Sequence, residues 1–298
     1  MTNLLLGMGL GLLIALVIRR TFLAHLIDSL ASGLFGSTEF FDQQELLLNY
    51  KKNSSWANLG YWSSTSDYSV AAQNLAELLG EQCQLKSGDH IFDIGFGNGD
   101  QLQLWRQKFS AAKVDGFNIS KSQLGFAKQH FSDDEVQLHL GSYQMMKDCG
   151  KADAIVALDC AYHFSSRKEF LEEAASALSP NGRLGLVDLA VNSAKGSFWD
   201  RIFLYLIAFG SKIPFENLWS AERFKDSLED AGFSEISWTD ISDQVFLPFD
   251  AFVQSMYIDL KDFAKPQLFY KYRITAWALK RLYGRGLLEM VVIGARKG

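Results

Sequence analysis

Short apolar runs alternate with amphipathic segments from residue 90 to the end of the chain. The runs at 90–95 and 113–119 are mostly apolar, which favours buried strands. Apolar residues at helical spacing follow them, at 100–109 and 120–131. Strands that alternate with helices predict an α/β fold with a Rossmann-like, doubly wound and mostly parallel sheet. We expect seven strands, the other five being 136–141, 152–159, 183–190, 233–242 and 287–297, with a turn at 179–182 before the strand at 183–190.

The N-terminus follows a different pattern. Residues 4–18 carry no charge, and Arg19 and Arg20 follow them. This run is shorter than the ~20 residues that usually span a bilayer, but the amphipathic stretch after it can extend it. We therefore expect residues 1–22 to form a membrane anchor, single-pass or monotopic, with the rest of the chain in the cytoplasm because the basic pair lies on that side. A buried core helix is the alternative. Residues 23–85 are expected to be mainly helical.

Composition narrows the classes of partner. The 298 residues have a net charge of −5, which disfavours nucleic acid because such binding usually needs a basic face. Cys83, Cys149 and Cys160 are an odd number of cysteines at no spacing typical of metal ligands. They predict neither a disulfide framework nor a metal site.

A glycine-rich loop follows the first expected strand. It contains Asp93, Gly95, Gly97 and Gly99, and glycines in this place allow a sharp turn and close approach of a ligand. Asp100 stands where the dinucleotide fingerprint has its third glycine, which argues against an NAD(P) oxidoreductase. A glycine-rich turn without a ligand is the alternative.

The loop and several later segments resemble class I S-adenosylmethionine-dependent methyltransferases. The resemblance is strongest to the branch that contains sterol, tocopherol and phosphoethanolamine methyltransferases and cyclopropane fatty acid synthases. It extends from about Trp56 to Asp188. The segments that carry it are N-L-G-Y-W at 58–62, G-F-N-I-S-K-S-Q at 116–123, A-L-D-C-A-Y-H-F at 157–164, and L-S-P-N-G-R-L at 178–184.

The resemblance implies S-adenosylmethionine as cofactor and a set of residues around it. Asp93 would organise the loop or receive the cofactor's ammonium group. Asn118 takes the place of the carboxylate that usually binds the ribose. Tyr61 and Trp62 would either enclose the sulfonium by cation–π contact or hold the N-terminal segment on the sheet as an aromatic staple. The full expected set is Tyr61, Trp62, Asp93, Gly95, Phe96, Gly97, Gly99, Asn118, Ile119, Gln123, Ser142 and Tyr143.

The end of the fourth expected strand faces the reaction centre in this family. Asp159, Tyr162 and His163 are therefore the candidates for orienting or deprotonating an acceptor. His163 is expected either as a base or as a structurally satisfied histidine. Tyr162 stands where cyclopropane synthases have a glutamate, which favours simple methyl transfer.

Two segments exceed what the sheet needs and are rich in aromatic residues, at about 191–218 and 245–283. Within a methyltransferase domain at 86–298, we expect them to form a cap over a hydrophobic, membrane-derived acceptor. A sterol, a prenylated ring, a fatty acyl chain and a phospholipid headgroup all fit. Two further alternatives are a soluble methyltransferase of small metabolites and a non-catalytic membrane protein that binds cofactor or lipid.

Overall fold

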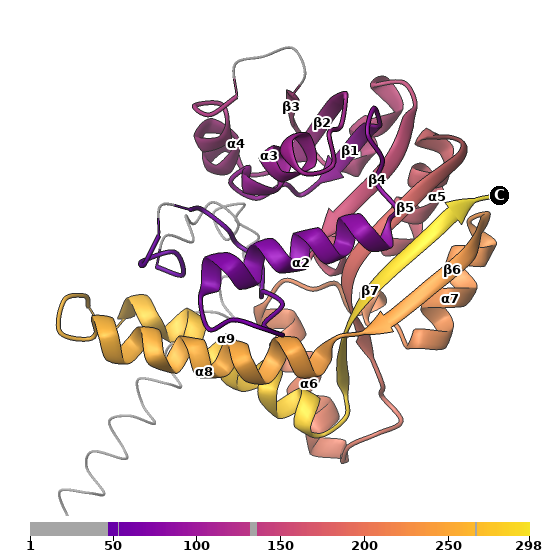
Figure 1. Cartoon of the computed structure of the whole chain (residues 1–298). Coiled ribbons are helices and arrows are strands. Elements are labelled where there is room, and N and C mark those ends of the chain that lie inside the picture. Colours follow the sequence, from indigo (N-terminus) through magenta and orange to yellow (C-terminus); the bar gives the residue numbers. More distant parts are fainter. Residues whose placement is uncertain (1–46, 53, 132–135, 266) are drawn as a thin grey trace, which may run out of the picture.

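The computed structural model describes residues 47–52, 54–131, 136–265 and 267–298. A single twisted sheet of seven strands organises them, in the spatial order β3-β2-β1-β4-β5-β7-β6 (Figure 1). The expected Rossmann-like α/β sheet is therefore confirmed. The strands are β1 (His90–Ile94), β2 (Lys113–Asn118), β3 (Val136–Leu140), β4 (Ala152–Leu158), β5 (Leu178–Val191), β6 (Phe233–Asp240) and β7 (Leu288–Lys297).

The direction of the strands changes at one edge of the sheet. The first five strands pair in parallel, whereas β7 pairs antiparallel with both β5 and β6. The Ser-Pro-Asn-Gly sequence at 179–182 predicts a turn before β5. This prediction is wrong, because the segment is an irregularity inside that strand. Leu178 pairs with Ala152 and Arg183 with Ala154, so additional residues on β5 bulge out of the ladder, with Asn181 at φ +60°.

Helices cover both faces of the sheet. One face carries α2 (Tyr68–Gln82), α3 (Asp100–Gln107) and α4 (Lys121–Ala127), and the other carries α5 (Arg167–Ala177), α7 (Ala221–Asp230) and the 3₁₀ helix η2 (Tyr143–Asp148). Side-chain caps begin four of these helices: Asp67, Ser120, Ser166 and Ser220 each accept a backbone N–H from the first turn. The carboxyl ends of the five parallel strands lie together at one end of the sheet, where the loops after β1, β2 and β4 meet.

Three more helices form a cap beside the carboxyl ends of the parallel strands: α6 (Phe198–Gly210), α8 (Ser242–Leu260) and α9 (Gln267–Gly284) (Figure 1). Helix α6 lies in the connection after β5, and α8 and α9 together form the connection between β6 and β7. The two ends of this second connection are joined. Ile241 N–H donates to the Met290 carbonyl at 2.9 Å, and Met290 N–H donates to Ser242 Oγ at 2.9 Å.

The apolar run at 4–18 and the rest of the expected anchor lie outside the described residues. Among the residues that the structure does describe, no helix is both long and apolar enough to span a bilayer.

Candidate active site

The glycine loop connects β1 to α3 in the predicted place. Its glycines adopt positive φ angles of +84° at Gly95, +58° at Gly97 and +109° at Gly99, a region that other residues enter only at a cost. A Cβ on Gly95 would lie 2.7 Å from Cys160 Sγ, so that glycine is needed for packing against the end of β4. A Cβ on Gly97 would meet only Ala57 Cβ, at 3.8 Å, and Gly97 lines the large cavity described below. Gly97 is thus the glycine that leaves room for a ligand.

Asp93 organises this loop from behind. Its carboxylate accepts hydrogen bonds from Gln101 Nε2 at 2.8 and 2.9 Å and from Trp105 Nε1 at 2.6 Å, and its side chain is fully buried. Burial raises the pKa of this carboxyl to about 7, against the lowering effect of the two hydrogen bonds. Asp93 does not line the cavity, nor does Gly99, which packs against Ala127 and precedes α3. Of the two roles expected for Asp93, the geometry therefore favours organising the loop over receiving the ammonium group.

Asn98 provides a better contact for a bound ammonium group, and the sequence reasoning missed it. Its Nδ2 donates to the Ser55 carbonyl at 3.0 Å, while its Oδ1 is buried without a hydrogen-bond partner among the described residues. Asn98 lines the cavity, so a ligand that donates a hydrogen bond would satisfy this oxygen. The methionine end of S-adenosylmethionine carries such a donor, and the loop therefore fits that cofactor.

The segment before α2 is hydrogen-bonded to the residue that follows the glycine loop. Ser55 N–H donates to both carboxylate oxygens of Asp100, at 3.3 and 3.2 Å, and Ser55 Oγ donates to the same carboxylate. Asp100 thus binds the N-terminal segment at the start of α3, where a negative charge is favourable. This contact explains why an aspartate stands at the position where a dinucleotide fingerprint has glycine.

The residues expected near the ribose and adenine lie together on the cavity wall: Asn118, Ile119, Gln123, Ser142 and Tyr143 all line it, as does Phe96. Asn118 Nδ2 donates to the Gly97 carbonyl at 3.1 Å and to Gln123 Oε1 at 2.9 Å, and its Oδ1 accepts from Ser120 N–H. The end of β2 is therefore linked directly to the glycine loop. Tyr143 is buried, and its hydroxyl donates to Glu169 at 2.7 Å.

Tyr61 and Trp62 do not line the cavity. Trp62 is buried against Tyr68 and Phe252, with ring centroids 6.2 and 5.2 Å away, and its Nε1 donates to the Leu59 carbonyl. Tyr61 is half-buried, and its backbone N–H donates to the Ala71 carbonyl. The cation–π role is therefore not what this geometry favours: the two residues form an aromatic staple that holds the segment before α2 against α8.

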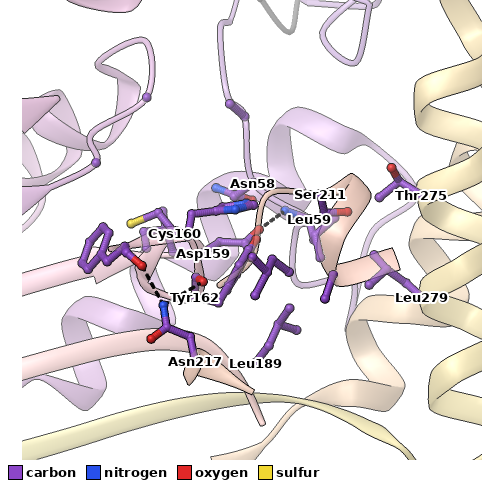
Figure 2. A pocket seen from close by; sticks show the side chains of 18 of the residues that line it. Asn58, Leu59, Asp159, Cys160, Tyr162, Leu189, Ser211, Asn217, Thr275 and Leu279 are labelled. Carbon is purple, nitrogen blue, oxygen red and sulfur yellow. Dashed lines mark hydrogen bonds between the residues drawn. The ribbon is translucent and has the colours of Figure 1, made fainter. Parts of the chain in front are cut away.

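The end of β4 brings together the three residues expected to act on an acceptor. Asp159 Oδ1 accepts from the Tyr162 hydroxyl at 2.8 Å and Oδ2 accepts from Leu59 N–H at 2.9 Å, and all of these residues line the cavity (Figure 2). Asp159 has φ +56°, an uncommon conformation for aspartate that its two hydrogen bonds hold in place. Burial raises the pKa of Asp159 to about 7. This value makes its carboxylate a base matched to neutral pH.

His163 also lines the cavity, in the 3₁₀ helix η3 (Ala161–His163). Burial lowers the pKa of its imidazole to about 4, so the ring is neutral at pH 7 and is a weaker base than Asp159. Asn217, which the sequence reasoning missed, fixes this segment. Its Nδ2 donates to the Tyr162 and Phe164 carbonyls at 3.2 and 2.7 Å, and its Oδ1 accepts from Arg167 N–H at 2.9 Å (Figure 2).

One continuous cavity of about 1320 Å³ connects the glycine loop at 95–98, the end of β2 and the end of β4 with the cap. It begins at the glycine loop, passes the end of β4, and continues between α6 and α9, where Leu204, Ile207, Thr275 and Leu279 line it. A pocket for one small ligand usually has a volume of ~300–1,000 Å³. The cavity is therefore large enough for a cofactor and an acceptor side by side.

Comparisons with known proteins agree with this geometry. Residues 92–186 match the family model described as a methyltransferase domain. The erythromycin 3''-O-methyltransferase of Saccharopolyspora erythraea is 26% identical over 65% of this chain and 66% of its own length, slightly under two thirds. The O-methyltransferase resE of Aspergillus sclerotiorum is 27% identical over 63% of this chain and 72% of its own.

The fold is shared with a solved structure of the mycolic acid cyclopropane synthase CmaA1 complexed with SAH and CTAB. That chain superimposes with a TM-score of 0.70 at 18% identity, over 88% of this chain and 94% of that chain. The matched domain, the named relatives, the strand order and the glycine loop lead to the same assignment. These findings show a methyltransferase domain at residues 92–186 and support a class I S-adenosylmethionine-dependent methyltransferase.

Proposed function

We propose that the protein transfers the methyl group of S-adenosylmethionine to a hydroxyl oxygen of a large, mostly apolar acceptor. The observation that carries the proposal is the single cavity of about 1320 Å³, which is lined by the cofactor loop at one end and by α6 and α9 at the other. Two relatives are named O-methyltransferases, which favours oxygen over carbon or nitrogen as the methyl acceptor. Sterols, prenylated rings and fatty acyl compounds that carry a hydroxyl group fit this description.

The residues at the end of β4 suit this reaction. When bound, S-adenosylmethionine supplies an activated methyl group on a sulfonium that is already a good leaving group. The protein must then align the acceptor, exclude water and accept the hydroxyl proton. Asp159 is the proposed base, because its pKa of about 7 leaves a large ionised fraction at neutral pH. The Tyr162 hydroxyl donates to Asp159 at 2.8 Å and orients the carboxylate.

His163 has a different proposed role. Its ring, kept neutral by burial, forms part of the wall that positions the acceptor, while the hydroxyl proton goes to Asp159. Leu189 and Asn217 line the same part of the cavity and would surround the reacting end of the acceptor (Figure 2).

We also propose that the acceptor enters the cavity from a membrane surface. Leu206 on α6 and Leu268 on α9 line the cavity and are also exposed, so the cavity opens to solvent between these two helices. Phe198, Trp199 and Tyr205 on α6 are exposed as well, with 63%, 73% and 47% of their surface accessible. An apolar surface beside a cavity entrance is typical of proteins that take ligands from lipid. The anchor expected at residues 1–22 would place this entrance close to the bilayer.

Calorimetry and a methyl-transfer assay test the proposal in sequence. The full chain, in detergent, is titrated with S-adenosylmethionine and then incubated with labelled cofactor and two extracts, one of lipids and one of polar metabolites. We expect saturable cofactor binding and label transferred to a compound of the lipid extract as a methyl ether. Transfer only to polar metabolites would refute the apolar acceptor. Cofactor binding without transfer to either extract would favour the non-catalytic alternative.

A further inference from the structure

A second group of chemically reactive side chains lies away from the cavity, on the face of the sheet that η2 covers. His90 on β1, Asp115 on β2 and His139 on β3 form a row across three neighbouring strands. Their registers explain the row: His90 pairs with Lys113, two residues before Asp115, and His139 pairs with Phe117, two residues after it. Alternate residues of a strand point to the same face, so all three side chains emerge together. Cys149, directly after η2, completes the group.

Three donor atoms in this group lie close enough together to share one ion. Asp115 Oδ1 is 2.7 Å from His139 Nε2, and His139 Nε2 is 3.9 Å from Cys149 Sγ. All three ligand atoms lie within 4.8 Å of one another. Ligand atoms around a tetrahedral zinc ion with ~2.0–2.3 Å bonds are about 3.3–3.6 Å apart. The separations of His139 Nε2 from Asp115 Oδ1 and from Cys149 Sγ therefore differ from the zinc geometry by less than 1 Å.

The second carboxylate oxygen of Asp115 is held by other groups. Oδ2 contacts His90 Nε2 at 2.6 Å and Lys113 Nζ at 2.9 Å. These partners hold the pKa of the buried carboxyl well below its usual range, against the opposing effect of burial. A metal-ligating carboxylate commonly has its free oxygen bound in this way, which fixes the direction of the ligating oxygen. The positive charge of Lys113 opposes a cation, but its side chain is 35% exposed and can turn toward solvent.

A hydrogen-bond network without metal accounts for the two histidines and Lys113, but it leaves Cys149 with weak sulfur contacts. The Cys149 sulfur has only long contacts, at 3.9 Å to His139 and 3.7 Å to the Met145 carbonyl. A nitrogen, an oxygen and a sulfur donor arranged around one point are the mixed set that zinc prefers. The donors come from two strands and the end of a 3₁₀ helix, which is why the spacing of the cysteines alone gave no indication of a metal site.

We propose that Asp115 Oδ1, His139 Nε2 and Cys149 Sγ bind a zinc ion, with a water molecule as the fourth ligand. His139 is 22% exposed, so water can reach the fourth position. Binding forms three bonds from the protein to zinc and releases the proton of the Cys149 thiol. Without metal, the hydrogen on His139 Nε2 faces Asp115. When zinc binds Nε2, exchange with solvent places a hydrogen on Nδ1 instead, so the ring itself releases no net proton. The net release is therefore one proton per zinc.

The ion would connect the peripheral strands to the cofactor site. Tyr143 begins η2 and lines the cavity, and Cys149 follows the other end of the same short helix. Zinc bound by Cys149 would tie η2 to β2 and β3, and so limit the movement of the cavity wall at Ser142 and Tyr143. Any ligand that binds only the folded state also raises its stability.

Metal binding is tested on the full chain after removal of metals with a chelator. Cobalt(II) serves as the spectroscopic probe because a bond to thiolate produces a charge-transfer absorption, and zinc is titrated by calorimetry in two buffers of different ionisation enthalpy. We expect one metal per chain, the charge-transfer band, and one proton released per zinc. Cys149→Ser is expected to lose the band and at least tenfold of the zinc affinity. Cys83→Ala is the matched control, since it removes a buried cysteine that is not in the cluster.

Circular dichroism verifies that each variant is folded before titration, and His139→Gln provides a second test of the cluster with Cys149 intact. It should weaken zinc at least tenfold. The absence of saturable zinc binding by the folded wild-type chain would overturn the proposal. So would unchanged affinity in Cys149→Ser, which would assign the metal to other residues.

Discussion

Replacement of Gly97 by alanine separates the shape of the cofactor site from the stability of the loop. Gly97 has φ +58°, and an alanine in this left-handed region costs ~1–2 kcal/mol relative to glycine. Its Cβ would meet no described atom closer than Ala57 Cβ at 3.8 Å, so no steric clash within the protein adds to that cost. The added methyl group would instead occupy space on the wall of the cavity. We expect the cofactor to bind at least tenfold more weakly, which corresponds to ~1.4 kcal/mol or more.

Gly88 provides the matched control. It lies in the exposed turn before β1 at φ +87°, a Cβ there would have no neighbour within 4 Å, and it does not line the cavity. Gly88→Ala should therefore lose at least as much unfolding free energy as Gly97→Ala, yet bind S-adenosylhomocysteine like the wild type. Urea denaturation measures the stability and calorimetry measures the affinity. Unchanged affinity in Gly97→Ala, or an equal loss in both variants, would refute the assignment of Gly97 to the cofactor wall.

Three further predictions concern the base, the staple and the cap. A base must be deprotonated to take a proton, so the rate of methyl transfer should rise as pH increases through about 7, the pKa of Asp159. Asp159→Asn should abolish most of the activity. A rise in rate centred near pH 4 would identify His163 as the base instead. Trp62→Phe should lower the unfolding free energy by ~1 kcal/mol, because the hydrogen bond from Trp62 to the Leu59 carbonyl is lost. Calorimetry should show unchanged cofactor affinity. A tenfold weaker affinity would instead support the cation–π role. Leu279→Trp fills the apolar end of the cavity and should raise the KM for the acceptor while leaving the Kd of the cofactor unchanged; parallel losses of both would indicate damage to the fold.

The elements that depend on local pattern were predictable. Strands β1, β2 and β4 are mostly buried and carry apolar residues on both faces, and the Ser120 side chain caps α4 where the sequence indicates. The glycine loop was recognisable since its spacing reflects backbone conformation, which a single residue type can satisfy. The bulge at 179–182 was misread as a turn because Ser, Pro, Asn and Gly favour both structures.

Side-chain direction was much harder to infer. Asp93 points to Gln101 and Trp105, away from the cavity, and only the packing of α3 on the sheet decides this orientation. Trp62 is buried by Phe252, which lies far away along the chain. Asn98 and Asn217 contribute through hydrogen bonds to backbone atoms of distant segments, and an isolated asparagine carries no pattern that indicates such contacts.

The joined ends of the connection between β6 and β7 make the second half of the cap an interchangeable cassette. Since Ile241 and Ser242 are hydrogen-bonded to Met290, the chain leaves the sheet and returns to it at one point, whatever lies between. Helices α8 and α9 can therefore lengthen, shorten or change their apolar faces without disturbing the register of β6 and β7. Evolution and protein engineering would then have a route to new acceptors that leaves the strand register intact, as long as Phe252 on α8 keeps its contact with Trp62.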